Sequence, residues 1–462
     1  MIIGNYYRMN KFAIAVSALC LLSLPANAAR PKTPQPAQQS QQPSYTLPEY
    51  NAEQAAAAEK DPQAKLKLLD AFVAQYPNST LMQYIYQFYY TAYYQLKNYG
   101  KAIEYADKLI ALGDKADLPV RVQAIQARVQ LFSGAFDPKA ADAHDQLAKQ
   151  RDAALLGVKL FPDLRKVPNS TVTDDQVKAG IAYLEAAAGA ASIQLKDYPA
   201  AIEAFKTALA NNPKDAVASY RLGLAYLSSN PPQALDGFWA LARSIALKVP
   251  DDAKIKDYLR SRILQYEQPG CDNQVDAQLN ELLQLAANSP DRPATYVIPS
   301  HDDLVKISQS STIITVINDL SGGGDKAKTT WLAICGAEFP EVVGKIIDIQ
   351  KAETAINFMV FTSDNADQMQ AATTPNMSVK VWTAPPPAGT ATGPGNVADV
   401  PQPDVVRFQK DDPIRFSGAL VSYDPSPFLL HWDQVKVDPT TIPGATGAPK
   451  RTPTRKPTAK PE

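Results

Sequence analysis

The stretch that decides the fold runs from Ala182 to Asp215 and reads AYLEAAAGAASIQLKDYPAAIEAFKTALANNPKD. Its apolar residues recur every three or four positions, as in amphipathic helices, and Asp, Asn and Pro separate the helical segments. Small residues stand where two helices must approach closely, a large aromatic residue fills the space beyond them, and a proline ends the second helix. The residues at these positions are Gly189, Ala201, Phe205, Ala208 and Pro213.

The same pattern returns with a period of about 34 residues, which is the length of one helix-turn-helix unit. In the following unit the corresponding residues are Leu222, Gly223 and Tyr226 on the first helix and Ala234 and Phe238 on the second. An upstream unit has a tyrosine where the later units have glycine; its residues are Tyr86, Tyr90, Tyr93, Ala102, Ala106 and Leu109. Residues 64–77 are expected to form the second helix of a degenerate unit.

Paired helices of this length, meshed through small residues, resemble the tetratricopeptide repeat (TPR) over about half of the chain. The resemblance implies an all-helical solenoid at residues 51–289, in which each unit packs on its neighbours. Residues 118–166 lack the small-residue signature, so we expect an irregular repeat or an inserted helix pair there. Helices near 252–266 and 275–287 are expected to cap the array.

The carboxy-terminal part, residues 296–440, is richer in β-branched and aromatic residues and is predicted to be a small, mainly β domain. A short helix is expected at Lys328 to Cys335. Strands are predicted at Thr312 to Ile317, Lys345 to Lys351, Ala355 to Thr362, Ser378 to Thr383, Pro413 to Tyr423 and Phe428 to Val437. The order of these elements loosely resembles an OB-type barrel, with a β-sandwich as the alternative.

The amino terminus has the pattern of a cleaved signal peptide. Arg8 and Lys11 precede an apolar run of about 13 residues, which is shorter than the ~20 needed to span a bilayer. Ala26-Asn27-Ala28 supplies the small residues of a cleavage site, so we predict a signal peptide at 1–28 that is cut after Ala28. The mature chain is then periplasmic or secreted, and not transmembrane.

Two terminal segments are predicted to be disordered, because their composition offers too little apolar surface to offset the entropy of ordering. Residues 29–50 form a linker rich in Pro, Gln and Ser. Residues 441–462 form a basic Pro/Thr tail, which either contacts an anionic envelope surface or is simply solvated. Its cations are Lys450, Arg451, Arg455, Lys456 and Lys460.

No catalytic or metal-binding pattern is present, so we expect a protein that is not an enzyme and has no cofactor. The three histidines, His144, His301 and His431, lie in separate segments without metal-ligand spacing. The turn at residues 322–326 lacks the Gly-Lys-Ser/Thr ending of a phosphate loop. A net charge of -1 without a basic groove argues against nucleic acid.

Two cysteines, Cys271 and Cys335, remain after removal of the signal peptide. An oxidising compartment would allow a disulfide between them. The alternative is two separate buried thiols.

The predicted function is to bind a protein partner in the concave face of the repeat array. First helices would supply the groove, so the expected partner-binding residues are Tyr89, Tyr94, Gln194 and Arg221. The alternative is a ligand- or glycan-binding protein of the cell envelope that acts through the β domain. Trp382, His431 and Trp432 invite that interpretation, although strand spacing favours burial of Trp432.

Overall fold

The computed structural model describes residues 44–271, 273–385 and 401–444. The predicted signal peptide, the linker up to residue 43 and the tail from residue 445 lie outside the described residues. Contacts between residues divide the chain into two compact units. The first comprises residues 1–256 with 283–292, and the second comprises residues 257–282 with 293–462.

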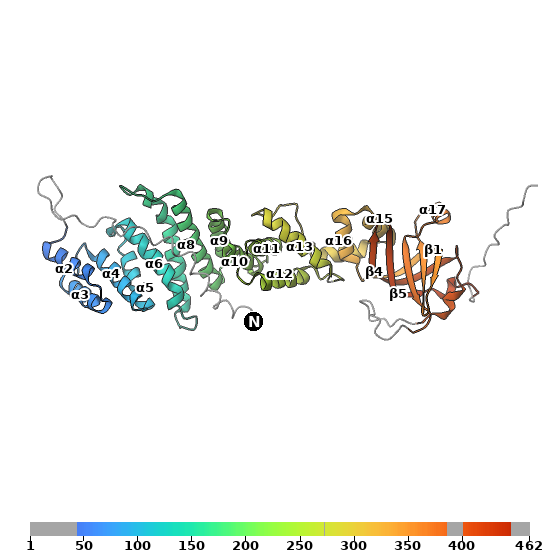
Figure 1. Cartoon of the computed structure of the whole chain (residues 1–462), viewed down its shortest axis with the longest axis horizontal. Coiled ribbons are helices and arrows are strands. Elements are labelled where there is room, and N and C mark those ends of the chain that lie inside the picture. The colour runs from blue at the N-terminus through green and yellow to red at the C-terminus, as the bar shows by residue number, and fades with distance from the viewer. Residues whose placement is uncertain (1–43, 272, 386–400, 445–462) are drawn as a thin grey trace, which may run out of the picture. The chain divides into compact units, whose positions relative to one another are not determined.

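The described part of the first unit is helical, and its helices follow one another in chain order (Figure 1). The elements are α2 (Leu47–Ala58), α3 (Pro62–Gln75), α4 (Met82–Gln95), α5 (Tyr99–Ile110), α6 (Leu118–Ala135), α7 (Ala143–Leu160), the 3-10 helix η3 (Phe161–Lys166), α8 (Asp174–Gln194), α9 (Tyr198–Asn211), α10 (Ala216–Ser228) and α11 (Ala234–Ala246). Two further helices, α12 (Asp252–Glu267) and α13 (Asn273–Asn288), are each divided between the two units.

The turn inside a helix pair recurs with the same geometry and with a sequence that differs only by Asn or Asp at one position. Gln-Leu-Lys-Asn-Tyr ends α4 and begins α5, and Gln-Leu-Lys-Asp-Tyr ends α8 and begins α9. The lysines, Lys97 and Lys196, have φ values of 58° and 61°, which place them in the left-handed region. Asn98 and Asp197 then cap the next helix, each accepting a backbone N–H at 3.2 Å.

Neighbouring helices in the chain pack against each other throughout the stack from α2 to α11. The first helices of successive pairs also contact each other, in the series α2, α4, α6, α8 and α10. Second helices make at most slight contacts with one another. The result is a solenoid-like arrangement with one continuous layer of first helices.

The predicted linker is too long by four residues, because Leu47 to Tyr50 belong to α2. Thr46 accepts the N–H of Glu49, whose side chain accepts the N–H of Thr46, so the two residues form a capping box. Pro48 therefore lies in the first turn of a helix, where proline is tolerated.

The second unit combines short helices with a closed five-stranded barrel (Figure 1). Its elements are α14 (His301–Ser310), α15 (Ile313–Gly322), α16 (Gly324–Ile334), β1 (Glu338–Lys351), β2 (Ala355–Phe361), α17 (Ala366–Ala371), β3 (Met377–Trp382), η4 (Pro403–Arg407), β4 (Pro413–Pro425), β5 (Phe428–Val437) and η5 (Pro439–Thr441). The strand order is β1-β2-β3-β5-β4. Only the β3–β5 pair among these strands is parallel. Closure favours the OB-like barrel over the sandwich.

One hydrophobic core fills the barrel and continues into α15 and α16. Trp432 lies at its centre, with edge-to-face contacts to Phe339 and Phe416 at ring distances of 5.5 and 5.4 Å. Ile442 also belongs to this core. The predicted start of a disordered tail at residue 441 is therefore wrong, since Thr441 ends η5 and Ile442 is buried.

The strand predicted at Thr312 to Ile317 is wrong, because these residues begin α15. Its β-branched composition suggests a strand, but Val316 and Leu320 recur at helical spacing and are buried. Thr312 caps the helix through a reciprocal pair of hydrogen bonds with Thr315. The other five predicted strands are present, and β1 begins at Glu338, earlier than the predicted Lys345.

Candidate functional site

Two neighbouring first helices, α4 and α6, are joined by side chains that lie about one repeat apart. Gln83 donates to a carboxylate oxygen of Asp117 at 3.1 Å and accepts the backbone N–H of Asp117 at 2.7 Å. The Tyr84 hydroxyl donates to the same carboxylate at 3.0 Å, and Gln87 donates to Gln123 at 3.1 Å. These bonds join α4 directly to residues at and beyond the start of α6.

The repeat-core residues bring each helix pair close together. A Cβ added at Gly189 would lie 2.9 Å from the ring of Phe205, and one added at Gly223 would lie 2.8 Å from Leu241. Glycine at these two positions therefore permits the close approach of α8 to α9 and of α10 to α11. Ala201, Phe205, Ala208, Leu222, Gly223 and Phe238 are buried, Tyr226 and Ala234 are half-buried, and Pro213 is exposed beyond the end of α9.

Tyr89 is not on the surface, although it is one of the predicted partner-binding residues. It is 2% exposed, its hydroxyl donates to Asp70 at 2.5 Å, and its ring stacks on Tyr105 at 4.0 Å. Burial and the bond to Asp70 raise the pKa of the Tyr89 hydroxyl. Tyr89 precedes Tyr90 just as Leu222 precedes Gly223, so it occupies a core position of the repeat.

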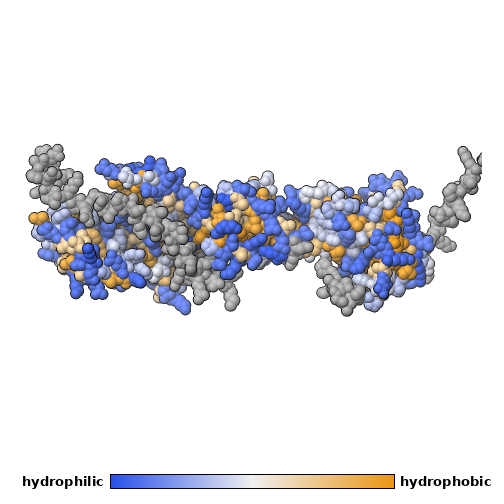
Figure 2. Space-filling model, in the orientation of Figure 1, coloured by the Kyte–Doolittle hydropathy of each residue, from blue (hydrophilic) through white to orange (hydrophobic). Residues whose placement is uncertain are grey.

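The other three predicted partner-binding residues lie on three different first helices and do not converge. Tyr94 on α4 is 52% exposed, with its ring 6.3 Å from that of Tyr99. Gln194 is exposed at the end of α8, and Arg221 is half-buried on α10. Any partner contacting Tyr94, Gln194 and Arg221 would have to extend across several repeats. Figure 2 shows hydrophobic side chains gathered on the visible face over α10 and α11, within a largely hydrophilic stack.

Cys271 and Cys335 form a disulfide, with their Cα atoms 5.7 Å apart. It closes a loop between residues 64 positions apart, so it is expected to stabilise the second unit by about 4 kcal/mol. An ion pair between Lys328 and Glu281, at 3.1 Å, joins α16 to α13. Both links lie within the second unit, to which residues 257–282 belong.

The histidines and tryptophans are separate in the structure. His144 is exposed near Asp145, His301 contacts the carbonyl oxygen of Glu267, and His431 is 2.8 Å from a carboxylate oxygen of Asp424. Within the described residues there is no group of three or more His, Cys, Asp or Glu side chains that could hold a metal. Trp382 and Trp432 are both buried, so neither ring offers an exposed face to a sugar or base.

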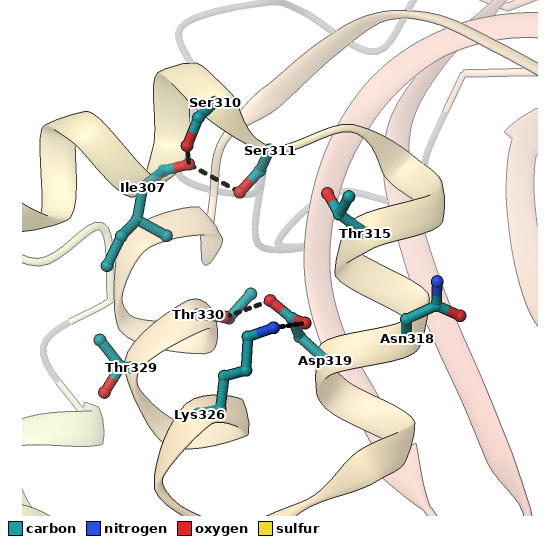
Figure 3. Close-up of a pocket in the computed structure, with 9 residues that line it drawn as sticks. All are labelled: Ile307, Ser310, Ser311, Thr315, Asn318, Asp319, Lys326, Thr329 and Thr330. Carbon is teal, nitrogen blue, oxygen red and sulfur yellow. Dashed lines mark hydrogen bonds and ion pairs between the residues drawn. The ribbon is translucent and has the colours of Figure 1, made fainter.

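One open pocket, lined by hydroxyl and amide side chains, lies among α14, α15 and α16 (Figure 3). Sequence reasoning did not identify it, because Thr312 to Ile317 was assigned to a strand. The signal was the helical spacing of the apolar residues on α15, which places Thr315, Asn318 and Asp319 together on another face of that helix.

No protein-family model matches the chain, and no curated protein matches it either. None of the described helices is both long enough and apolar enough to cross a membrane. The class that the structure defines is a solenoid-like helical stack followed by a closed five-stranded barrel.

Proposed function

We propose that this protein is an exported scaffold of the TPR type, which binds another polypeptide on the layer of first helices. The observation that carries the proposal is the pair of hydrogen bonds between Gln83 and Asp117, residues 34 positions apart. Direct contact at the repeat distance is what a stack of equivalent helix pairs requires. The recurring helix-to-helix turn at Lys97 and Lys196 supports the same period.

The contact pattern also supports a concave binding face. First helices contact each other along the stack, whereas second helices make at most slight contacts with one another. When the helices of one layer lie closer together than those of the other, the stack curves, and the closely spaced layer lies on the inside of the curve. On this proposal the layer from α2 to α10 lines the inside of the curve, where an extended segment or a helix of a partner would bind.

The side chains on this layer suit a polypeptide ligand. Tyr94 offers a large, rigid surface with a hydroxyl for backbone groups, at a low cost in side-chain entropy. Gln194 adds amide donors and acceptors, and Arg221 adds a guanidinium. Because these groups are distributed over three helices, binding would combine many modest contacts and would involve no single reactive centre. We therefore propose a binding role without catalysis.

Export is part of the proposal. The predicted signal peptide would direct the chain to the periplasm or the exterior, where a disulfide such as Cys271–Cys335 persists. Fractionation of cells that express the full chain should recover a form shortened by about 28 residues outside the cytoplasm. Recovery of only the full-length protein in the cytosol would contradict this part of the proposal.

Binding is tested by affinity capture from an envelope extract, followed by mass spectrometry. The test variant carries Tyr94→Ala, Gln194→Ala and Arg221→Ala, and the matched control carries Glu203→Ala and Lys206→Ala on the second helix α9, where both side chains are exposed. A partner that is bound by the wild type and the control but lost by the test variant supports the proposal. Equal capture by all three proteins would contradict binding on the first-helix layer.

A further inference from the structure

The pocket among α14, α15 and α16 has a volume of about 500 Å³, and eight of its nine lining residues are polar or charged (Figure 3). Five of its lining residues carry hydroxyl groups: Ser310, Ser311, Thr315, Thr329 and Thr330. Its only charged lining residues are Asp319 and Lys326. All of these residues belong to the second unit, whereas the helices to which we assign partner binding belong to the first.

Each of the five hydroxyls already donates its proton to a protein oxygen. Ser310 and Ser311 donate to the Ile307 carbonyl, at 3.1 and 2.6 Å, and Ser310 also reaches that of Lys306 at 2.8 Å. Thr315 and Thr329 donate to the carbonyls of Thr312 and Asp325, at 2.8 and 2.9 Å. The Thr315 oxygen already accepts the backbone N–H of Thr312, but the other hydroxyl oxygens offer an incoming group lone pairs and not protons.

The fifth hydroxyl, that of Thr330, donates to one carboxylate oxygen of Asp319 at 3.0 Å. Thr330 is 3% exposed, so it fixes the carboxylate from the buried side. The other carboxylate oxygen lies 2.7 Å from the Lys326 ammonium group, as Figure 3 shows. The pocket thus already accepts one alkylammonium group, which belongs to its own wall.

The ammonium group of Lys326 can move away from Asp319 at little cost. The Lys326 side chain is 77% exposed, whereas Asp319 is 18% exposed and held by Thr330. The pair contributes little to holding Lys326 in place, because its ammonium group is well solvated and the side chain loses entropy when it is fixed at Asp319. An external ammonium could replace Lys326 at Asp319 and leave the lysine in solvent.

We propose that this pocket binds the ammonium group of an alkylamine, with Asp319 as its counter-ion and Lys326 as the group that it displaces. A small diamine and a lysine side chain of a polypeptide both meet this requirement, since both present the same primary ammonium on a flexible stem. The lining favours a cation over an anion, because its one cation, Lys326, is already paired with Asp319 and the hydroxyl protons are donated to protein oxygens.

The test is isothermal titration of the mature chain with cadaverine and, separately, with N-acetyl-lysine methylamide at low ionic strength. Lys326→Ala removes the competing ammonium and should tighten binding about two- to five-fold. Asp319→Asn should weaken it at least about ten-fold, as expected for loss of a charged hydrogen-bond partner. Lys328→Ala changes a lysine on the same helix that pairs with Glu281 and does not line the pocket, so it should have no effect.

Thermal melting of each variant shows whether it is folded, and the opposite effects of Lys326→Ala and Asp319→Asn separate binding from damage to the fold. Saturable binding of cadaverine alone indicates a small amine, and binding of the lysine derivative alone indicates a polypeptide. The proposal is overturned if neither probe binds wild type or Lys326→Ala. It is equally overturned if Asp319→Asn binds as tightly as wild type.

Discussion

Gln83 and Asp117 bind each other twice across two successive first helices, side chain to carboxylate and backbone N–H to side chain. Gln83 is 8% exposed, so its buried amide group depends on these bonds for its partners. These two hydrogen bonds link the stacking of α4 on α6 to particular side chains. Their contribution can be tested by removing the Gln83 side chain.

Gln83→Ala should lower the free energy of unfolding of the first unit by about 1–3 kcal/mol, because it leaves the backbone N–H of Asp117 without its partner and removes one of the two hydrogen bonds to the Asp117 carboxylate. Urea unfolding followed by circular dichroism measures the change. Gln95→Ala, at the exposed end of the same helix, is the control and should change stability by less than about 0.5 kcal/mol. Equal effects of the two substitutions would show that the α4–α6 bonds do not stabilise the stack.

Gly189→Ala should destabilise the first unit by about 1–3 kcal/mol, because the added methyl group meets the Phe205 ring at 2.9 Å. Gly100→Ala provides an opposite control. It adds a methyl group to α5 with nothing within 4 Å, and should stabilise that helix by about 0.5–1 kcal/mol. Combining Gly189→Ala with Phe205→Leu should recover part of the loss. A stabilising effect of Gly189→Ala would contradict close packing of α8 on α9.

Reduction of the Cys271–Cys335 disulfide should lower the stability of the second unit by about 4 kcal/mol, since the bond restricts a loop of 64 residues in the unfolded chain. Thermal unfolding with and without dithiothreitol measures the effect. The Cys271→Ser/Cys335→Ser variant should resemble the reduced protein and should no longer respond to dithiothreitol. An unchanged melting temperature after verified reduction would count against a stabilising role for the bond.

Glu267 should make the second unit less stable as the pH rises from about 4.5 to 7. Its side chain is fully buried, and burial raises its pKa from 4.5 to about 7, while neighbouring Gln278 acts in the opposite direction. Well below pH 4.5 the Glu267 carboxyl is protonated in both the folded and the unfolded state, so it causes no loss of stability. Above that pH the unfolded chain releases the proton first, so folding is penalised progressively, reaching about 3 kcal/mol near pH 7.

Glu267→Gln removes the titrating group and should flatten the dependence of stability on pH between 4.5 and 7. It should also raise stability at pH 7 relative to wild type. Chemical unfolding of both proteins across this range measures the difference. Glu341→Gln on β1 is an exposed control that should leave the profile of the wild type unchanged. Parallel profiles for wild type and Glu267→Gln would refute the assignment.

The repeat helices could be predicted because their determinants are local. Gly189 and Phe205 belong to adjacent helices, and the period of about 34 residues reports the same packing in each unit. The error at Tyr89 arose within this pattern: an exposed tyrosine was expected at a position equivalent to Leu222, which is buried. Aromatic character suggested binding, whereas the position in the repeat indicated the core.

The second unit was harder to predict, because its order depends on distant contacts. Thr312 to Ile317 has strand composition, but packing of Val316 and Leu320 against the barrel core favours a helix. Ile442 belongs to the core despite the Pro- and Thr-rich sequence around it. The pocket at Asp319 depends on three helices meeting, which no single stretch of sequence reveals.

The most direct measurement is site-specific photocrosslinking in intact cells. A photoreactive amino acid replaces Tyr94 on the first-helix layer in one strain and Lys206 on a second helix in another, and crosslinked products are identified by mass spectrometry. If the first-helix layer binds a polypeptide, Tyr94 yields a discrete protein adduct that Lys206 does not. Failure of Tyr94 to crosslink, or the same adducts from both positions, would contradict a scaffold that binds through its first helices.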